Sequence, residues 1–434
     1  MPSFIARRAA LTTAAGMLLV GAAALPAHAE SVRGQQWFLD AMKAEQMWKT
    51  STGQGITVAV LDTGVNADHP DLAGRILPGK DMAGTERGDE HTDYEGHGTS
   101  MAGFIAATGA RAGGHGAFGL APGTKILPVR LPRVEKLDPA VADKEFATAM
   151  ATGIRYATDH GAKVINISQA STVGGTELTS AVKYALDKGA LVFAGVGNAG
   201  DKGNPVMYPA ATPGAVGVAA IGKNLKKTAE SEFGPQVDMA APGEDMVEAC
   251  GGRTGLCTSH GTSDATAMAS ASAALIWSAH PTWTNNQVLR VMLNTIGAPV
   301  DGSKRTDSIG YGIVRPRIAL TDPGNPGPAD QYPLPDFPVR ASAAPSVSPS
   351  TGYGDSKEHQ AAGARNDSSS STGTWVAAGA GAVIVAGAAA GFAAMRRRKR
   401  TAGTGQVAPS PAPYGPSPSY GPTSRNPQDQ HRPY

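Results

Sequence analysis

Residues Ile56 to Gly64 read ITVAVLDTG, an apolar and β-branched run that ends in an aspartate, a threonine and a glycine. Its part from Ile56 to Leu61 predicts a fully buried strand, because strands covered on both faces show no polar alternation. Similar runs occur at Val164 to Ile167, Leu191 to Ala194 and Val216 to Ile221. Helical patterns occur at Glu177 to Lys188, Thr262 to Ala279 and Asn285 to Asn294. This alternation predicts an α/β fold in three layers, with a mostly parallel central sheet covered by helices on both faces.

Four polar residues stand directly after predicted strands or at helix starts, where sheets of this kind bind their ligands. Asp62 closes the first strand, although an Asp before Gly is often a turn former. His97 lies between two glycines in GHGTSMAGFIAA, where a lone histidine is usually structural. Ser263 begins the helix in SHGTSDATAMASASAAL as a cap or, beside an imidazole, as a nucleophile. Asn198 follows LVFAGVG and could donate to an oxyanion, so the joint occurrence of the four indicates one active site.

The segments VAVLDTGV, GHGTSMAG, FAGVGN and GTS resemble, in this order, the Asp, His, Asn and Ser motifs of the subtilisin-like serine proteases. The similarity covers residues 36 to 320. It implies a subtilisin-like fold and a catalytic triad of Asp62, His97 and Ser263, with Asn198 and the Ser263 N–H holding the oxyanion. It also implies that an extended substrate lies against Ser168, Gln169, Ala170, Gly195, Val196 and Gly197.

The chain departs from the family pattern at three places. Asp264 follows Ser263 where the family usually has methionine, and its carboxylate either bonds the helix end or alters the pH dependence. Gln169 and Ala170 stand where Leu-Gly is common, so the side-chain preference does not carry over. The loop from Thr108 to Gly119 lacks the Asn and Asp ligands of the family's calcium loop. The sequence therefore predicts no metal and no cofactor.

The amino-terminal region predicts export. Residues 1–29 contain two arginines, an apolar run and Ala-His-Ala before Glu30, which is typical of a secretory signal peptide; an anchor helix is the alternative. Residues 30–320 are the predicted peptidase domain with an amino-terminal extension. The residues between Glu30 and the first strand are too few for a folded propeptide.

The carboxyl-terminal region predicts a membrane anchor. Residues 321–374 are rich in Pro, Ser and Ala and predict a stalk. Residues 375–395 hold no charge and are long enough to span a membrane, although a buried helix or an Ala/Gly linker is the alternative. Residues 396–434 begin with the basic run RRRKR, which is typical of the cytoplasmic side, and continue as a disordered tail. This layout resembles the mycosins, the membrane proteases associated with type VII secretion, and implies a single-pass cell-membrane protein with an extracellular catalytic domain and secretion-system partners.

The composition and the cysteines agree with an exported enzyme. The formal net charge of +2 is close to balance, and the clearest basic run, Arg396 to Arg400, directly follows an apolar stretch, so nucleic-acid binding is not predicted. Cys250 and Cys257 are the chain's 2 cysteines, and in an exported protein such a pair predicts a disulfide; free or metal-binding thiols are the alternative.

The sequence thus predicts a serine endopeptidase that cleaves exported or cell-surface proteins. A protease fold kept as a membrane-tethered structural component of a secretion assembly is the alternative from another class. An esterase is disfavoured because Ser263 lacks the G-x-S-x-G elbow and the triad order is Asp, His, Ser.

Overall fold

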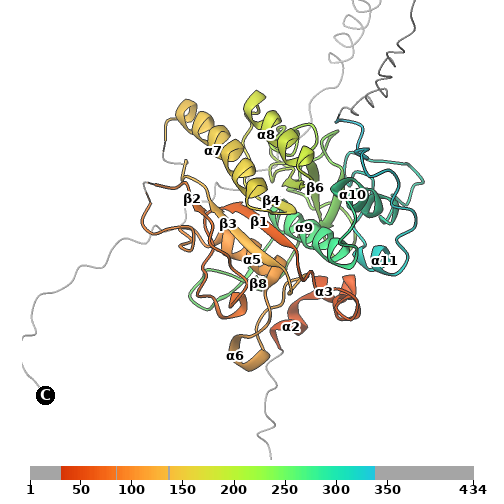
Figure 1. Ribbon diagram of the computed structural model, residues 1–434, viewed down its shortest axis with the longest axis horizontal. Coiled ribbons are helices and arrows are strands. Elements are labelled where there is room, and N and C mark those ends of the chain that lie inside the picture. Colours follow the sequence, from red (N-terminus) through yellow and green to blue (C-terminus); the bar gives the residue numbers. More distant parts are fainter. Residues whose placement is uncertain (1–30, 85, 135–136, 338–434) are drawn as a thin grey trace, which may run out of the picture. The chain divides into compact units, whose positions relative to one another are not determined.

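The computed structural model describes residues 31–84, 86–134 and 137–337 (Figure 1). Within these residues, one parallel sheet has the strand order β2-β3-β1-β4-β5-β6-β7. The strands are β1 Thr57–Asp62, β2 Lys80–Asp81, β3 Lys125–Arg130, β4 Val164–Ile167, β5 Leu191–Gly195, β6 Val216–Ile221 and β7 Met239–Pro242. Strand order reverses between β1 and β4, and the crevice beyond such a switch point is where open α/β sheets bind ligands.

Helices cover both faces of the sheet, as the sequence predicts (Figure 1). On one face, α5 (His97–Ala106) contacts β1, while α9 (Thr262–Ala279) contacts β4 to β7, and the two helices contact each other. On the other face, α7 (Pro139–Asp159) and α8 (Thr176–Asp187) pack together over β1, β3, β4 and β5. The fold is therefore α/β with a parallel central sheet in the middle layer.

Helix α9 is buried on all sides, and its composition explains how. Fifteen of its residues are buried, most of them Ala, Ser or Thr, and small side chains let the helix lie close to the sheet. Its hydroxyls find partners inside the protein: Ser272 Oγ donates to Met268 O, and Ser270 Oγ donates to Asn166 Oδ1 on β4 at 3.0 Å. Both bonds offset the cost of burying a hydroxyl group, and the second one ties α9 to β4, the strand beside β1.

Shorter elements surround this core. They are α2 Val32–Gln35, α3 Trp37–Met42, α4 Ala44–Met47, η1 Pro70–Leu72, α6 Arg111–Gly114, α10 Asn285–Asn294 and α11 Pro316–Thr321. An antiparallel hairpin of β8 (Met246–Ala249) and β9 (Leu256–Ser259) leads into α9. The amino-terminal segment docks through buried Phe38 and Leu39 and through Trp37 Nε1, which donates to Glu244 O at 3.0 Å.

The packed part of the chain continues beyond residue 320, where the sequence analysis places the start of the stalk. Tyr332 and Leu334 are buried, and Tyr332 OH donates to Gly214 O at 2.8 Å. The boundary is thus corrected to at least Phe337, because isolated aromatic residues in a Pro-rich stretch bury surface without any periodic pattern. The predicted signal peptide, span and tail lie outside the described residues, and no described helix is long and apolar enough to cross a membrane.

Candidate active site

The structure brings the predicted triad residues to one edge of the sheet. Asp62 is the last residue of β1, and His97 is the first residue of α5. Ser263 is the second residue of α9, and Asn198 lies in the loop after β5. All four therefore lie beyond the carboxyl ends of parallel strands, near the switch point between β1 and β4.

Asp62 and His97 form a direct hydrogen bond. His97 Nδ1 lies 2.8 Å from Asp62 Oδ1, while the carboxylate is fully buried and the imidazole is 31% exposed. Asp62 Oδ1 also accepts from Thr63 N at 2.8 Å. Gly98 makes this approach possible, because a Cβ there would lie 2.1 Å from Gly64 O and 3.0 Å from Asp62 Cβ. The imidazole therefore presents Nε2 away from the carboxylate.

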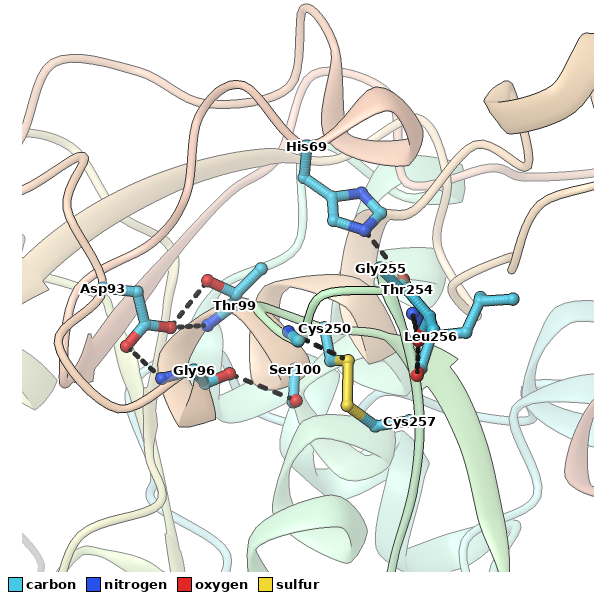
Figure 2. The surroundings of a disulfide bond; sticks show 11 residues. His69, Asp93, Gly96, Thr99, Ser100, Cys250, Thr254, Gly255, Leu256 and Cys257 are labelled. Carbon is cyan, nitrogen blue, oxygen red and sulfur yellow. Dashed lines mark hydrogen bonds between the residues drawn. A yellow bond between two sulfur atoms is a disulfide. The ribbon is translucent and has the colours of Figure 1, made fainter. Parts of the chain in front are cut away.

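The loop before His97 is organised by Asp93 (Figure 2). Its carboxylate accepts from Gly96 N at 2.7 Å and from Thr99 N at 2.8 Å, and also from Thr63 Oγ1 at 2.7 Å. These bonds link the end of β1 to the first turn of α5, whose orphan N–H groups need acceptors. Asp93 thus fixes the position of the backbone that holds His97.

Carboxylates around His97 set its protonation. Burial alone would lower the pKa of His97, but the charge and hydrogen bond of Asp62, together with the charges of Asp264 and Asp93, raise this pKa from 6.5 to about 9. Asp264 is buried and accepts from Ser259 Oγ at 2.7 Å. Burial raises the pKa of Asp264 to about 6, and burial with the charge of Asp264 raises the pKa of Glu248 to about 8. The structure thus shows that Asp264 bonds β9, in addition to acting on His97 electrostatically.

Ser263 occupies the first turn of α9 and is partly exposed. Its hydroxyl donates to Ser168 O at 3.2 Å, and Ser168 Oγ donates back to Ser263 O at 3.1 Å. Among the described residues, no hydrogen bond joins Ser263 Oγ to His97 in this structure. As a residue near the start of the helix, Ser263 has an N–H without a carbonyl partner inside α9.

Asn198 lies against the start of α9. Its Oδ1 accepts from Thr262 N at 2.9 Å and from Thr262 Oγ1 at 3.0 Å. Its Nδ2 donates no hydrogen bond to a described residue, and the residue is exposed. Gly261 has φ +137°, and a Cβ there would lie 3.1 Å from Asn198 Nδ2. The amide N–H₂ is therefore held next to the Ser263 turn and is available to a ligand.

The residues predicted to contact substrate divide into two groups. Ser168 and Gln169 are partly exposed and Ala170 is exposed, so this segment can face a substrate. Val196 is fully buried, its N–H donates to Val218 O, and Gly197 uses its N–H and C=O within the domain. The segment from Gly195 to Gly197 is buried in this structure, because β5 continues into a segment that packs under α9, and its contact with a substrate stays a prediction.

Sequence reasoning missed two features of the site. Gln169 Nε2 donates to Asp62 Oδ1 at 3.2 Å, so this side chain contacts the Asp62–His97 pair. Glu248, buried on β8, interacts electrostatically with Asp264 and His97. The only sequence signal for Gln169 was a polar residue where the family commonly has leucine.

A disulfide joins Cys250 and Cys257 across the β8–β9 hairpin, close to the loop that carries His97 (Figure 2). A Cβ on Gly251 would lie 2.8 Å from Gly96 Cα, so the bridged loop packs against the residue before His97. In the loop of the same hairpin, Gly255 O lies 2.9 Å from the ring Nε2 of His69, the residue that precedes η1. The bridge thus restrains the segment that contacts the His97 loop and leads into Ser263.

The described part of the chain holds no group of three or more His, Cys, Asp or Glu side chains placed to bind a metal.

Known proteins are similar to this chain in sequence and in fold. The Subtilase family description matches residues 53–332. Thermitase of Thermoactinomyces vulgaris is 41% identical over 202 residues, which are 46% of this chain and 68% of thermitase. The crystal structure of MycP1 from Mycobacterium smegmatis has a TM-score of 0.61 and 28% identity, covering 74% of this chain and 91% of that one. MycP3 protease from the type VII (ESX-3) secretion system has a TM-score of 0.59 and 30% identity, covering 69% and 90%.

These similarities confirm the resemblance to the subtilisin-like proteases, and they extend to solved mycosin structures. The family match spans more than half of the chain and includes the positions of Asp62, His97, Asn198 and Ser263. On this evidence the chain belongs to the subtilase family and is a subtilisin-like serine endopeptidase.

Proposed function

We propose that Asp62, His97 and Ser263 form the catalytic triad of this endopeptidase and act through an acyl-enzyme. The observation that supports this proposal most strongly is the 2.8 Å bond between Asp62 Oδ1 and His97 Nδ1, with Ser263 at the adjoining start of α9. Such a bond fixes the proton on Nδ1 and leaves Nε2 as the base. To react, the Ser263 hydroxyl must leave Ser168 O and bond to Nε2; catalytic hydrogen bonds often tighten only with substrate bound.

The first half of the reaction forms the acyl-enzyme. Ser263 Oγ bonds to the substrate's carbonyl carbon while its proton passes to His97 Nε2, and the carbonyl electron pair moves onto oxygen. The resulting oxyanion accepts hydrogen bonds from Asn198 Nδ2 and from the Ser263 N–H. When the carbonyl re-forms, the C–N bond breaks and the leaving amine takes the proton from Nε2.

The second half releases the product. A water molecule gives its proton to His97 Nε2 as its oxygen attacks the ester carbon. Collapse of the second oxyanion breaks the bond to Ser263 Oγ, which recovers the proton. Asp62 stays ionised throughout and stabilises the imidazolium formed in each half.

We further propose that the substrates are exported or cell-surface proteins and that the enzyme associates with type VII secretion. The likeness to MycP1 and to MycP3 protease supports this proposal. The proposed arrangement is a signal peptide over residues 1–29, a stalk that ends at residue 374, a span at residues 375–395 and a cytoplasmic tail at residues 396–434. The peptidase domain would then lie outside the cell, tethered to the membrane.

Fluorophosphonate labelling tests the nucleophile and the location together. The full-length chain is expressed in cells. A membrane-impermeant fluorophosphonate probe is then applied to intact cells and, separately, to lysed cells. We expect labelling of Ser263 in both, mapped by mass spectrometry and absent in Ser263→Ala. Labelling only after lysis would contradict the extracellular location. A folded chain that stays unlabelled in both would contradict the triad and favour a structural component of a secretion assembly.

The oxyanion role of Asn198 predicts a separate loss of rate. In Asn198→Leu, we expect kcat to fall by about 10²–10³ with little change in KM, because one oxyanion donor is lost. Peptide hydrolysis measures both constants. Asn204→Leu is unsuitable as a control because Asn204 bonds the backbone of Phe233. Asn294→Leu, at the exposed last position of α10, should keep full activity. A rise in KM with kcat unchanged would instead assign Asn198 to ground-state binding.

A further inference from the structure

Gln169 lies over the Asp62–His97 pair because of the register between two neighbouring strands. Leu61 on β1 pairs with Ile167 on β4, so the residues that follow them leave the sheet side by side. Ser168 is fixed there, since its Oγ donates to Ser263 O and accepts from Asn166 Nδ2 at 3.2 Å. The backbone that carries Gln169 is thus anchored to both β4 and α9.

The Gln169 amide contacts both members of the pair. Its Nε2 lies 3.2 Å from Asp62 Oδ1 and 3.4 Å from His97 Nδ1. Among the described residues, His97 and Gln169 are the side chains that hydrogen-bond the Asp62 carboxylate, and Asp62 Oδ2 is buried without a hydrogen bond. One of the two N–H groups of this amide is therefore committed to Asp62 and is not available to a substrate.

We propose that Gln169 is a positioning residue for the Asp62–His97 pair, rather than a wall of the substrate pocket. The inference rests on the proposed triad. By donating to the oxygen that also accepts from His97 Nδ1, the amide limits rotation of the carboxylate and keeps that oxygen aimed at the imidazole. It also shares the negative charge of that oxygen, because a hydrogen bond to a charged acceptor draws electron density from it.

The sign of the effect follows from this geometry. Without the Gln169 donor, more of the Asp62 charge acts on the imidazole, so the pKa of His97 rises. A base with a higher pKa stays protonated to a higher pH, so the acid limb of kcat/KM moves upward. The other ionisable groups that act on His97 come from three further elements and are unchanged by the substitution: Asp93 before α5, Asp264 on α9 and Glu248 on β8.

Two variants of the full-length enzyme test the proposal. In Gln169→Leu we expect kcat to fall about 10-fold at neutral pH with KM unchanged, and the acid limb to move up by about half a pH unit. In Gln169→Glu, which is nearly isosteric, a second negative charge beside the imidazole should move the limb up by about one unit or more. The Nδ1 proton of His97, observed by NMR, should shift in both variants. Gln46→Leu, at an exposed position on α4, should match the wild type in every respect.

The outcomes separate this proposal from the proposed triad. The measurement uses peptides that differ only in the residue before the scissile bond. A change of KM that depends on that residue, with the pH limb unmoved, would make Gln169 a specificity wall and overturn the proposal. Unchanged kinetics and an unmoved NMR signal in both variants would also overturn it. Circular dichroism confirms folding, and Gln169→Glu decides the matter if Gln169→Leu does not fold. Full activity in Ser263→Ala would instead reject the triad itself.

Discussion

Ser263→Ala and His97→Ala are each expected to lower kcat by about 10⁶, and the double variant is expected to be no slower than either one. The reason is that the two side chains perform one step together. Without the imidazole, the hydroxyl keeps its proton; without the hydroxyl, the imidazole has no nucleophile to activate. A residual rate of about 10³ to 10⁴ over water should remain in all three variants, supplied by the oxyanion donors and by substrate binding.

The measurement is peptide hydrolysis by the wild type, both single variants and the double variant at one pH. Ser272→Ala is the matched control, because Ser272 is buried in the same helix and, among the described residues, its hydroxyl bonds only to Met268 O within that helix. It should retain the wild-type rate. A double variant slower than the single variants by the product of their effects would mean that Ser263 and His97 act independently, which the proposed triad does not allow.

Much of the fold could be predicted because the deciding segments are apolar throughout or periodic. The bounds predicted for β4, β6, α9 and α10 agree with the structure, β1 is shifted by one residue at both ends, and β5 is one residue longer than predicted. Strand β3 was missed because Pro128 interrupts its pattern, and proline is unusual inside a central strand. The backbone groups of Ile126 and Arg130 hydrogen-bond to Arg75 and Met82, which lie on the β2 side of β3. By alternation along the strand, the backbone nitrogen of Pro128 faces the same side, at a level before β2 begins at Lys80. Its missing N–H is thus placed where the ladder has a gap.

The active site could be predicted only as far as its residue types and order. The resemblance to the subtilisin-like proteases implied the pairing of Asp62 with His97, and the structure supplies its distance. The bond from Ser263 Oγ to Ser168 O depends on a side-chain torsion, which no sequence pattern specifies. The contact of Gln169 with Asp62 depends on the register of β1 and β4, which is set by tertiary packing. What the sequence left open was therefore which side chains surround the pair.

Asp62→Asn is expected to lower the plateau of kcat by about 10⁴ while leaving KM nearly unchanged. An asparagine amide is nearly isosteric, but it can present N–H₂ to the imidazole and so favour the tautomer with its proton on Nε2. That tautomer cannot accept the Ser263 proton. The substitution also removes the main charge that raises the pKa of His97, so the remaining activity should show an acid limb at lower pH than in the wild type.

Asp264→Asn is the matched control for charge. Asp264 also raises the pKa of His97, but it bonds Ser259 and does not touch the imidazole nitrogen that faces Asp62. We therefore expect the acid limb to move to lower pH in Asp264→Asn while the plateau of kcat is kept. Equal plateau losses in the two variants would show that the negative charge alone matters and would contradict the orienting role of Asp62.

The stability of Asp62→Asn should depend on pH in a direction fixed by the same pair. The folded-state pKa of His97 is raised from 6.5 to about 9, so the pair stabilises the fold fully below the unfolded value and loses this contribution as the pH rises through about 9. The stability advantage of the chain with Asp62 over the Asp62→Asn variant should accordingly be larger at pH 6 than at pH 10. Urea unfolding in a Ser263→Ala background, which prevents self-digestion, measures the difference. Because neither Asp62 nor His97 contributes to the raised pKa of Asp238, the contribution of Asp238 cancels in that difference. An advantage that grows toward alkaline pH would mean that His97 is held neutral by burial, and that Asp62 does not stabilise its charged form.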